Sequence, residues 1–334
     1  MPQPGETLAS APAAPRTPAA PAGAQASWPT GVRESGASRA IDTIGDAWVL
    51  RILRSAFRGT RRFSGFLQAL EVSRAVLSER LERMVADGLL FKTAPDGGHA
   101  EYRLTEPALD LWGTLIAMWR WERDWGTGRE LQATLADRPR PRLVHRDCGH
   151  EMTPRYICSH CREEITPFET EAVLQAPADT PPTADAGDRT RKRYRKSHGG
   201  DRGALPTLMR VYGDRWNAAL MAAALQGART FSEFERALGI GPTQLSDRLT
   251  ELQALGLVRA RAYAGSRQEY RLTRAAIATF PITLELIRWG DRWLWGGRGP
   301  LAVRHRRCGH PTDARWACGH CAALLERRTV VFAD

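Results

Sequence analysis

Two short stretches rich in cysteine and histidine stand out from the rest of the chain. The first, HRDCGHEMTPRYICSHC, spans residues 145–161, and the second, HRRCGHPTDARWACGHC, spans residues 305–321. Each has the order His-x2-Cys, then nine residues, then Cys-x2-Cys. An x2 turn lets two side chains point at one metal ion, and two such turns joined by a short hairpin are the ligand layout of a zinc ribbon.

We expect each stretch to bind one zinc ion through its own ligands. The two predicted sites are His145, Cys148, Cys158 and Cys161, and His305, Cys308, Cys318 and Cys321. His150 is the alternative histidine ligand of the first stretch, although His145 fits the x2 geometry better. Four protein ligands leave no open coordination position, so the predicted role is structural. A segment this short needs the metal in order to fold.

The number and placement of the cysteines limit the other interpretations of these two stretches. All six cysteines lie in these two stretches, three in each, and an odd number per stretch argues against a simple disulfide framework. Two other interpretations stay open: thiols that oxidise and release zinc, as in a redox sensor, and cysteines that bind no metal. The Pro/Ala-rich N-terminus has no apolar secretory segment, so we expect a reducing, cytoplasmic location.

The chain also repeats itself on a larger scale. Residues 45–105 align with residues 213–273 without a gap, with 25 identities in 61 positions. The two Cys/His stretches align in the same gapless way, with 145–161 on 305–321. A whole module is therefore duplicated, and its period is too long for a solenoid repeat.

Both copies predict the same order of elements: helix, short helix, helix, β-hairpin and final helix. In the first copy, apolar residues three or four apart predict an amphipathic helix over 41–57. Ser64, Ser73 and Thr105 are suited to cap the short helix, the third helix and the final helix. The predicted strands are residues 89–94 and 100–105. A short helix, a tight turn and a second helix form a helix-turn-helix, and the hairpin makes it winged.

These elements resemble the HxlR-type winged-helix transcription regulators. The shared landmarks in the first copy are GDAW, GTRRF, SRAVLSERL, DGLL and EYRLT. The second copy repeats them, except that GIGPTQ replaces EVSRAV, with Gly241 and Pro242 at the start of the helix. The resemblance covers about residues 39–126 and 205–295. It implies a nucleoid-associated transcription regulator that binds double-stranded DNA, whose relatives usually pair as homodimers through their terminal helices.

The resemblance places the third helix of each copy in the major groove of DNA. Its candidate contact residues are Ser73, Arg74, Ala75, Ser78, Glu79 and Arg80 in the first copy, and Thr243, Gln244, Ser246, Asp247 and Arg248 in the second. Arg74 suits guanine and Gln244 suits adenine. Arg80 and Arg248 share one matched position and suit either a phosphate or an internal carboxylate. Arg61, Arg62 and Arg229 lie in the predicted turns and are suited to contact phosphates. His99 and Arg267 lie in the predicted wings and are suited to the minor groove.

The predicted fold class is mainly α with small β-hairpins, an α+β winged helix. The predicted segments are a disordered tail (1–38), a winged domain (39–126), a zinc-ribbon-like module (140–168), a flexible basic linker (169–203), a second winged domain (204–295) and a second module (301–334). The Trp-rich final helices either fill their own cores or pack copy against copy. In the second case one chain acts as an intramolecular pseudo-dimer; further pairing as a homodimer is also open.

The charge distribution of the chain limits which kinds of partner it is expected to bind. The formal charge is +11, but residues 39–126 carry 13 Lys and Arg against 12 Asp and Glu, and residues 205–294 carry 12 against 8. The basic run at 189–196 is either a solvated linker or an arm on DNA. The chain has no apolar run long enough to span a membrane.

The sequence does not predict an enzyme, because it has no Walker loop, no dinucleotide fingerprint and no nucleophile beside a base. The competing interpretation is a zinc-stabilised protein-interaction or redox-sensing regulator in which only the first winged domain binds DNA. A small-molecule or redox effector is compatible with either interpretation.

Overall fold

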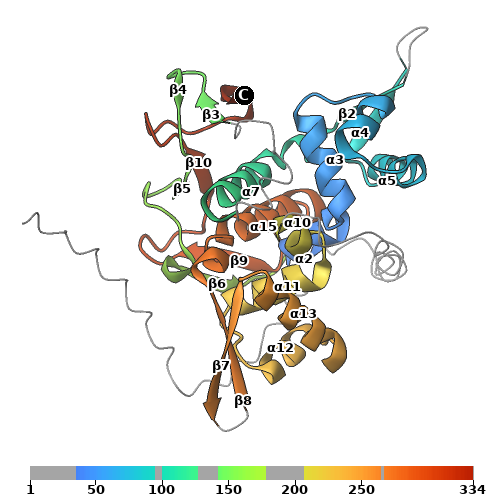
Figure 1. Ribbon diagram of the computed structural model, residues 1–334. Helices are drawn as coiled ribbons and strands as arrows, with labels where there is room; N and C mark the ends of the chain where they lie inside the picture. Colours follow the sequence, from blue (N-terminus) through green and yellow to red (C-terminus); the bar gives the residue numbers. More distant parts are fainter. Residues whose placement is uncertain (1–34, 95–99, 127–141, 178–206, 265–266, 334) are drawn as a thin grey trace, which may run out of the picture.

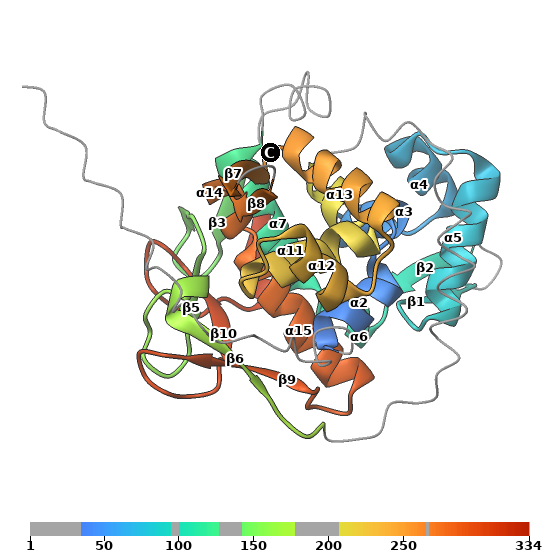
Figure 2. The same cartoon turned by 90° about the horizontal axis from the view of Figure 1, so that it is seen from below.

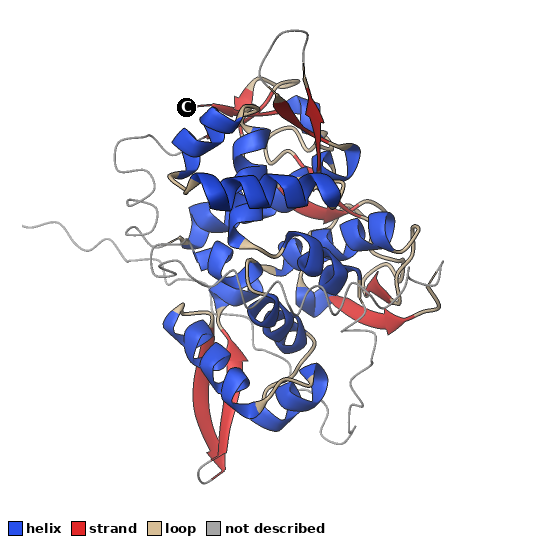
Figure 3. Cartoon of the chain, turned by 90° about the vertical axis from the view of Figure 1, so that its right-hand side faces the viewer, coloured by secondary structure: helices blue, strands red, loops and turns tan. Residues whose placement is uncertain are grey.

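The computed structural model describes residues 35–94, 100–126, 142–177, 207–264 and 267–333. The predicted fold class is confirmed: two mostly helical winged domains carry small antiparallel hairpins, and short strands form a further body beside them (Figures 1 and 3). His99, the basic run at 189–196 and most of the N-terminal tail lie outside the described residues.

The first winged domain has the predicted order of elements. They are α2 (Gly36–Ile44), α3 (Ala47–Phe57), α4 (Phe63–Leu70), α5 (Arg74–Ala86), β1 (Leu90–Thr93), β2 (Glu101–Leu104), α6 (Glu106–Leu109) and α7 (Trp112–Trp125). Strands β1 and β2 pair antiparallel, with Leu90 opposite Leu104. Phe66, Leu77 and Leu81 are fully buried and join the helix-turn-helix to the core.

The second winged domain repeats this arrangement. Its elements are α10 (Thr207–Tyr212), α11 (Arg215–Leu225), α12 (Phe231–Leu238), α13 (Pro242–Ala254), β7 (Val258–Ala264), β8 (Arg267–Leu272), α14 (Arg274–Ile277) and α15 (Phe280–Leu294). Phe234, Leu245 and Leu249 are buried at the positions equivalent to the three core residues of the first copy. Both copies therefore use one core pattern.

Some predicted helix boundaries are wrong. The helix predicted over 41–57 is broken at Gly45, because the Asp46 side chain accepts hydrogen bonds from the backbone N–H of Trp48 and Val49 and starts α3. The predicted final helix is also divided, into α6 and α7, although within the described residues no side chain caps the start of α7. Ser64 does not cap α4, because Arg62 is held extended by a bridge to Glu101 and the helix starts at Phe63. By contrast, side-chain caps at the predicted starts of α5 and α6 are confirmed.

The ordered parts of the chain also extend beyond two predicted boundaries. The Ser35 side chain caps α2, so the first winged domain starts before residue 39. Strand β6 (Thr170–Leu174) lies in the predicted flexible linker, because it pairs with β9 (Leu301–His305) of the second copy. Tertiary pairing therefore orders a segment whose composition is typical of a linker.

Helix α15 lies at the centre of the molecule and packs against α2 and α7 of the first copy (Figure 1). The contact with α2 is close, because a Cβ atom at Gly290 would meet the backbone of Gly36. Glycine permits this approach since it has no side chain. The two copies thus share one continuous helical core.

Two tryptophans make the same contact in opposite directions across this core. Trp121 Nε1 donates to the carbonyl of Ala275, and Trp289 Nε1 donates to the carbonyl of Pro107, each at 2.7 Å. When the two winged copies are aligned, the two donors occupy one matched position and the two acceptors occupy another. Such reciprocity is typical of a two-fold, isologous interface. These tryptophans therefore pack copy against copy.

The remaining strands form a body that we call the clasp, residues 142–174 and 301–333. Its other strands are β3 (Arg142–His145), β4 (His150–Glu151), β5 (Arg155–Cys158), β10 (Ala314–Ala317) and β11 (Val330–Ala333). Strand β3 pairs with β11, β6 with β9, and β5 with β10, so each of these pairs joins one copy to the other. Figure 2 shows β5 and β10, and β6 and β9, side by side.

Candidate metal centres and DNA-reading helices

The Cys/His residues form two four-residue clusters, and each cluster takes ligands from both copies. The clusters are His145, Cys148, Cys318 and Cys321, and Cys158, Cys161, His305 and Cys308. The prediction that each stretch supplies all four ligands of its own site is therefore wrong. The strand pairing gives the physical reason: antiparallel β5 and β10 carry the second x2 turn of each copy to the first x2 turn of the other.

The distances within the clusters suit a tetrahedral metal ion. His145 Nδ1 lies 3.4 Å from Cys321 Sγ, and Cys148 Sγ lies 4.0 Å from Cys318 Sγ. The second cluster repeats these spacings. For zinc with ordinary bond lengths, the tetrahedral edges are about 3.6 Å from nitrogen to sulfur and about 3.8 Å between sulfurs. The donor set and its dimensions therefore fit Zn²⁺.

Local backbone geometry prepares each x2 turn. The N–H of Gly149 donates to the carbonyl of His145, and the N–H of Arg162 donates to that of Cys158, at 2.8 and 2.9 Å. Gly149 has φ of 71° and Arg162 has φ of 64°, both in the left-handed region. Gly309 and Ala322 adopt the same conformations in the second copy. Each pair of candidate ligands is thus held on a tight turn.

Half of the eight cluster residues are buried, whereas Cys148, Cys161 and Cys308 are half-buried and Cys321 is exposed. His145 and His305 are fully buried, and Cys158 and Cys318 are 0% and 1% exposed. Burial raises the pKa of the Cys318 thiol. The backbone N–H of Ala323 donates to Cys321 and, with neighbouring hydrogen bonds, lowers the pKa of that thiol to about 7. A thiolate is the form that binds a metal ion.

The other histidines of the two stretches lie outside the four-residue clusters, and His150 and His320 form a separate, more exposed group with Cys148. His150 stacks on His320, and His160 stacks on His310, with ring centroids 3.7 and 3.4 Å apart. His150 Nδ1 is held 2.6 Å from the carbonyl oxygen of Cys148. The buried His145, whose Nδ1 faces the thiols, is therefore better placed as the fourth ligand than His150.

Arg80 and Arg248, which were candidates for DNA contact, point into the protein. Arg80 is 6% exposed, and its Nε lies 3.1 Å from the carboxylate of Asp46. Arg248 makes the equivalent ion pair with Asp214 at 3.0 Å. Of the two partners considered for this position, the internal carboxylate is correct. Each pair ties the third helix to the start of the preceding core helix.

Most other candidate DNA-contact residues lie on the surface. Residues classed as exposed are Arg61, Arg62, Ser73, Arg74, Ala75, Glu79, Thr243, Ser246, Asp247 and Arg267, and those half-buried are Ser78, Gln244 and Arg229. Ser73 caps α5, and Ser78 bonds Glu82. Arg74 lies over the Phe63 ring, with its guanidinium carbon 5.5 Å from the ring centroid. The helices α5 and α13 lie on the side of the molecule away from β5 and β10 (Figure 1).

Sequence reasoning missed the roles of Asp46 and Asp214. Each caps a core helix through two backbone N–H groups and also pairs with the buried arginine of the third helix. The repeated Gly-Asp-x-Trp landmark was the available signal, since aspartate directly before an apolar helix is a strong N-cap.

The fold is that of a winged helix-turn-helix protein. Residues 43–130 and 211–296 match the HxlR-like helix-turn-helix family, and together these ranges cover more than half of the chain. The chain belongs to this family of transcription regulators, and it carries the domain twice.

Several known proteins are similar. The uncharacterized HTH-type transcriptional regulator Rv3095 of Mycobacterium tuberculosis is 37% identical over 130 residues, which is 38% of this chain and 78% of that protein. The uncharacterized regulator YvaP of Bacillus subtilis is 34% identical over 87 residues, which is 25% of this chain and 81% of that protein. A crystal structure of PA1607, described as a putative transcription factor, is 30% identical and covers 48% of this chain and 97% of its own, with a TM-score of 0.33.

Among the described residues, no helix is both long enough and apolar enough to cross a lipid bilayer.

Proposed function

We propose that this chain is a DNA-binding transcription regulator in which the two winged domains of one polypeptide act as a dimer. The observation that carries the proposal is the reciprocal contact of Trp121 and Trp289 with the opposite copy. This contact fixes the orientation of the two winged domains, which are related by an approximate two-fold axis. Two-fold proteins of this class insert paired recognition helices into successive major grooves about one helical turn apart, roughly 34 Å.

In this proposal α5 and α13 read the two half-sites, and they read them differently. The exposed face of α5 offers Arg74, which suits guanine. The corresponding face of α13 offers Thr243 and Gln244 and an acidic Asp247. We therefore expect an imperfect inverted repeat in which the half-site read by α5 contributes more of the affinity.

The proposed cofactor is structural zinc, one ion in each shared cluster. Each ion would then cross-link two pairs of ligands, one pair from each copy. A site closed by four protein ligands leaves no open coordination position for catalysis. Zinc would hold the clasp strands together and would thereby fix the orientation of the two winged domains relative to each other. The proposed role is therefore regulatory DNA binding and not an enzymatic one.

The experiment that tests the function is selection of bound DNA from a random pool at a stated salt concentration, followed by footprinting. We expect two unequal half-sites whose centres lie one helical turn apart or a multiple of it. A footprint confined to one half-site would favour the competing interpretation, in which only the first winged domain binds DNA. The observation that favours this alternative is that Pro242 stands in α13 at the position of Arg74 in α5.

A further inference from the structure

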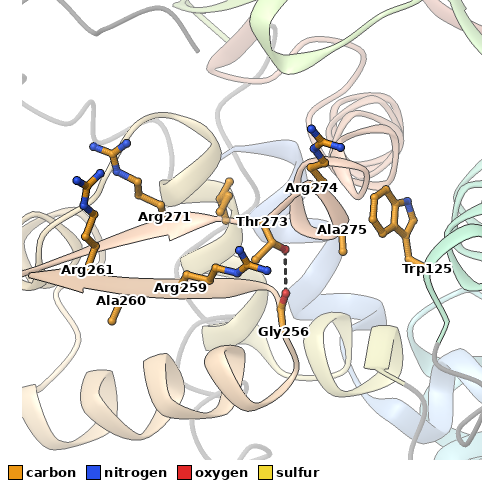
Figure 4. A pocket seen from close by; sticks show the side chains of 10 residues that line it. Trp125, Gly256, Arg259, Ala260, Arg261, Arg271, Thr273, Arg274 and Ala275 are labelled. Atoms are coloured by element: carbon orange, nitrogen blue, oxygen red, sulfur yellow. Dashed lines mark hydrogen bonds between the residues drawn. The ribbon is translucent and has the colours of Figure 1, made fainter. Parts of the chain in front are cut away.

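We propose that a cavity between the two copies binds a small aromatic anion. The cavity has a volume of about 770 Å³ and lies where the C-terminal end of α7 meets the base of the β7–β8 wing (Figure 4). Its lining includes Trp125 from the first copy and Arg259, Arg261, Arg271 and Arg274 from the second. Ligand pockets commonly have volumes of about 300–1,000 Å³.

Strand register places three of these arginines on one face of the hairpin. Arg259 and Arg261 are two residues apart on β7, so they share one face of the hairpin, and Arg271 is the Cα partner of Arg259 on β8. Ala260 and Tyr270, which pair on the opposite face, point toward the helices, where Tyr270 contacts Phe234. The guanidinium groups thus lie on the face of the wing turned away from its own helical core.

These charges are only partly neutralised by the described residues around them, because Glu269, the Cα partner of Arg261, lies on the same face of the hairpin. Arg271 pairs with Glu269 at 2.8 Å, whereas no carboxylate among the described residues pairs with Arg259, Arg261 or Arg274. Several positive charges on one wall of the cavity attract an anion, and guanidinium groups bind carboxylates in a planar, bidentate geometry. The site therefore selects a negatively charged group.

Trp125 supplies the aromatic wall. Trp125 is 40% exposed, so part of its indole is open to a bound molecule. Trp293, the equivalent residue of the second copy, instead donates from Nε1 to Asp110 at 2.8 Å. An exposed indole beside arginines can stack on a planar ring, so the anion should carry an aromatic body.

The equivalent place on the other side of the molecule lacks this chemistry. In the alignment of the two copies, Phe91, Thr93 and Glu106 stand where the second copy has Arg259, Arg261 and Arg274. The fold is the same on both sides, so the fold does not require the arginines. The difference confines the anion site to one side of a nearly symmetric protein.

Titration calorimetry of the full chain with four probes tests the proposal without DNA, so its failure is distinguishable from failure of the proposed function. The probes are terephthalate, benzoate, cyclohexane-1,4-dicarboxylate and benzamide, which vary charge and aromaticity separately. We expect terephthalate to bind most tightly, the two others that carry charge to bind more weakly, and benzamide to show no saturable heat. Binding of benzamide equal to that of terephthalate, or no binding of terephthalate at millimolar concentration, would overturn the proposal.

A second experiment uses variants, including one in which arginines of the second copy are replaced by the residues at the equivalent positions of the first copy. The double variant Arg259→Phe, Arg261→Thr should weaken terephthalate binding at least about tenfold, which corresponds to about 1.4 kcal/mol of binding free energy, because two charged donors are lost. Trp125→Leu should reduce the preference for terephthalate over its cyclohexane analogue. The matched control Arg103→Ala, at the position equivalent to Arg271, should leave binding unchanged. If the double variant binds terephthalate normally but loses DNA affinity and salt dependence, the arginines contact the DNA backbone and the anion site is refuted.

Discussion

Tyr156 and Trp316 face each other at the centre of the clasp, with ring centroids 4.6 Å apart. They occupy the same position in the two aligned Cys/His stretches and are Cα partners in the β5–β10 pair. The local two-fold axis therefore passes between them. Tyr156 is also hydrogen-bonded to the buried Glu285 of α15, so the clasp is tied to the central helix as well as to itself.

The buried Glu285 belongs to a charged group between the copies whose other members are half-buried. Arg288 lies between Glu285 and Asp110, at 3.0 and 3.1 Å from their carboxylates. Burial raises the pKa of Glu285, and the two carboxylates raise the pKa of Arg288 above its ordinary value. This group joins the second copy's central helix to the turn between α6 and α7 of the first.

Replacing Arg80 tests whether its role is internal. Arg80→Met should lower the free energy of unfolding by about 3 kcal/mol, because it leaves the carboxylate of Asp46 buried without its partner. Denaturant unfolding measures this change. The control Arg61→Met, at an exposed position, should change stability by less than about 0.5 kcal/mol. Unchanged stability with lost DNA binding in Arg80→Met would return this arginine to the DNA interface.

Replacing Arg74 tests the reading face of α5. Arg74→Ala should weaken binding to the selected DNA by about 1–3 kcal/mol and relax the choice of one base pair. Gln244→Ala on α13 should have a smaller effect, restricted to the other half-site. Fluorescence anisotropy at fixed salt gives both affinities, and unchanged thermal melting controls for folding. Equal losses at both half-sites from either variant would contradict the assignment of one helix to each.

Asp291 gives a prediction for pH. Burial raises the pKa of its carboxyl from the ordinary value of 3.8 to about 7. A carboxyl with a raised pKa in the folded state binds its proton more tightly there than in the unfolded chain. The stability it contributes is complete below about pH 4 and is lost as the pH rises to about 7.

Asp291→Asn should remove this part of the pH dependence. At pH 8 the variant should be more stable than the natural chain by about 1 kcal/mol, after allowance for the partly exposed position. Urea unfolding between pH 4 and pH 8 measures the difference. A variant whose stability follows the same pH profile as the natural chain would show that Asp291 is ionised when folded.

Removal of metal should loosen the clasp. A strong chelator is expected to lower the melting temperature by more than about 5 °C, because the ligand pairs then lose their cross-link. Zinc should restore the original value and magnesium should not, since thiolates prefer softer ions. Melting that does not respond to the chelator would mean that the strands and aromatic core hold the clasp without metal.

The sequence was sufficient for the features that depend on local pattern. Apolar spacing and caps such as Ser73 and Thr105 predicted the winged elements, and the repeat predicted that they occur twice. It failed at Gly45, where a repeated Gly-Asp pair stops one helix and caps the next. It also failed at residues 170–174, whose order comes from pairing with β9.

The sharing of ligands could not be predicted from the spacing of the cysteines. An x2 turn fixes which two side chains point together, but it does not specify which other turn supplies the remaining pair. Both copies have the same nine-residue separation, so ligation within a copy and between copies fits the sequence equally well. Only the antiparallel pairing of β5 with β10, centred on Tyr156 and Trp316, decides between them.

Zinc counting in paired cysteine variants tests the shared clusters most directly. Cys148→Ser with Cys321→Ser removes ligands from one cluster, although the residues belong to different copies. Cys148→Ser with Cys161→Ser removes one ligand from each cluster, although both belong to the same stretch. Elemental analysis should return about two zinc ions for the natural chain, about one for the first variant and about none for the second. The reverse order, with none in the first variant and one in the second, would contradict the account and restore a separate site in each copy.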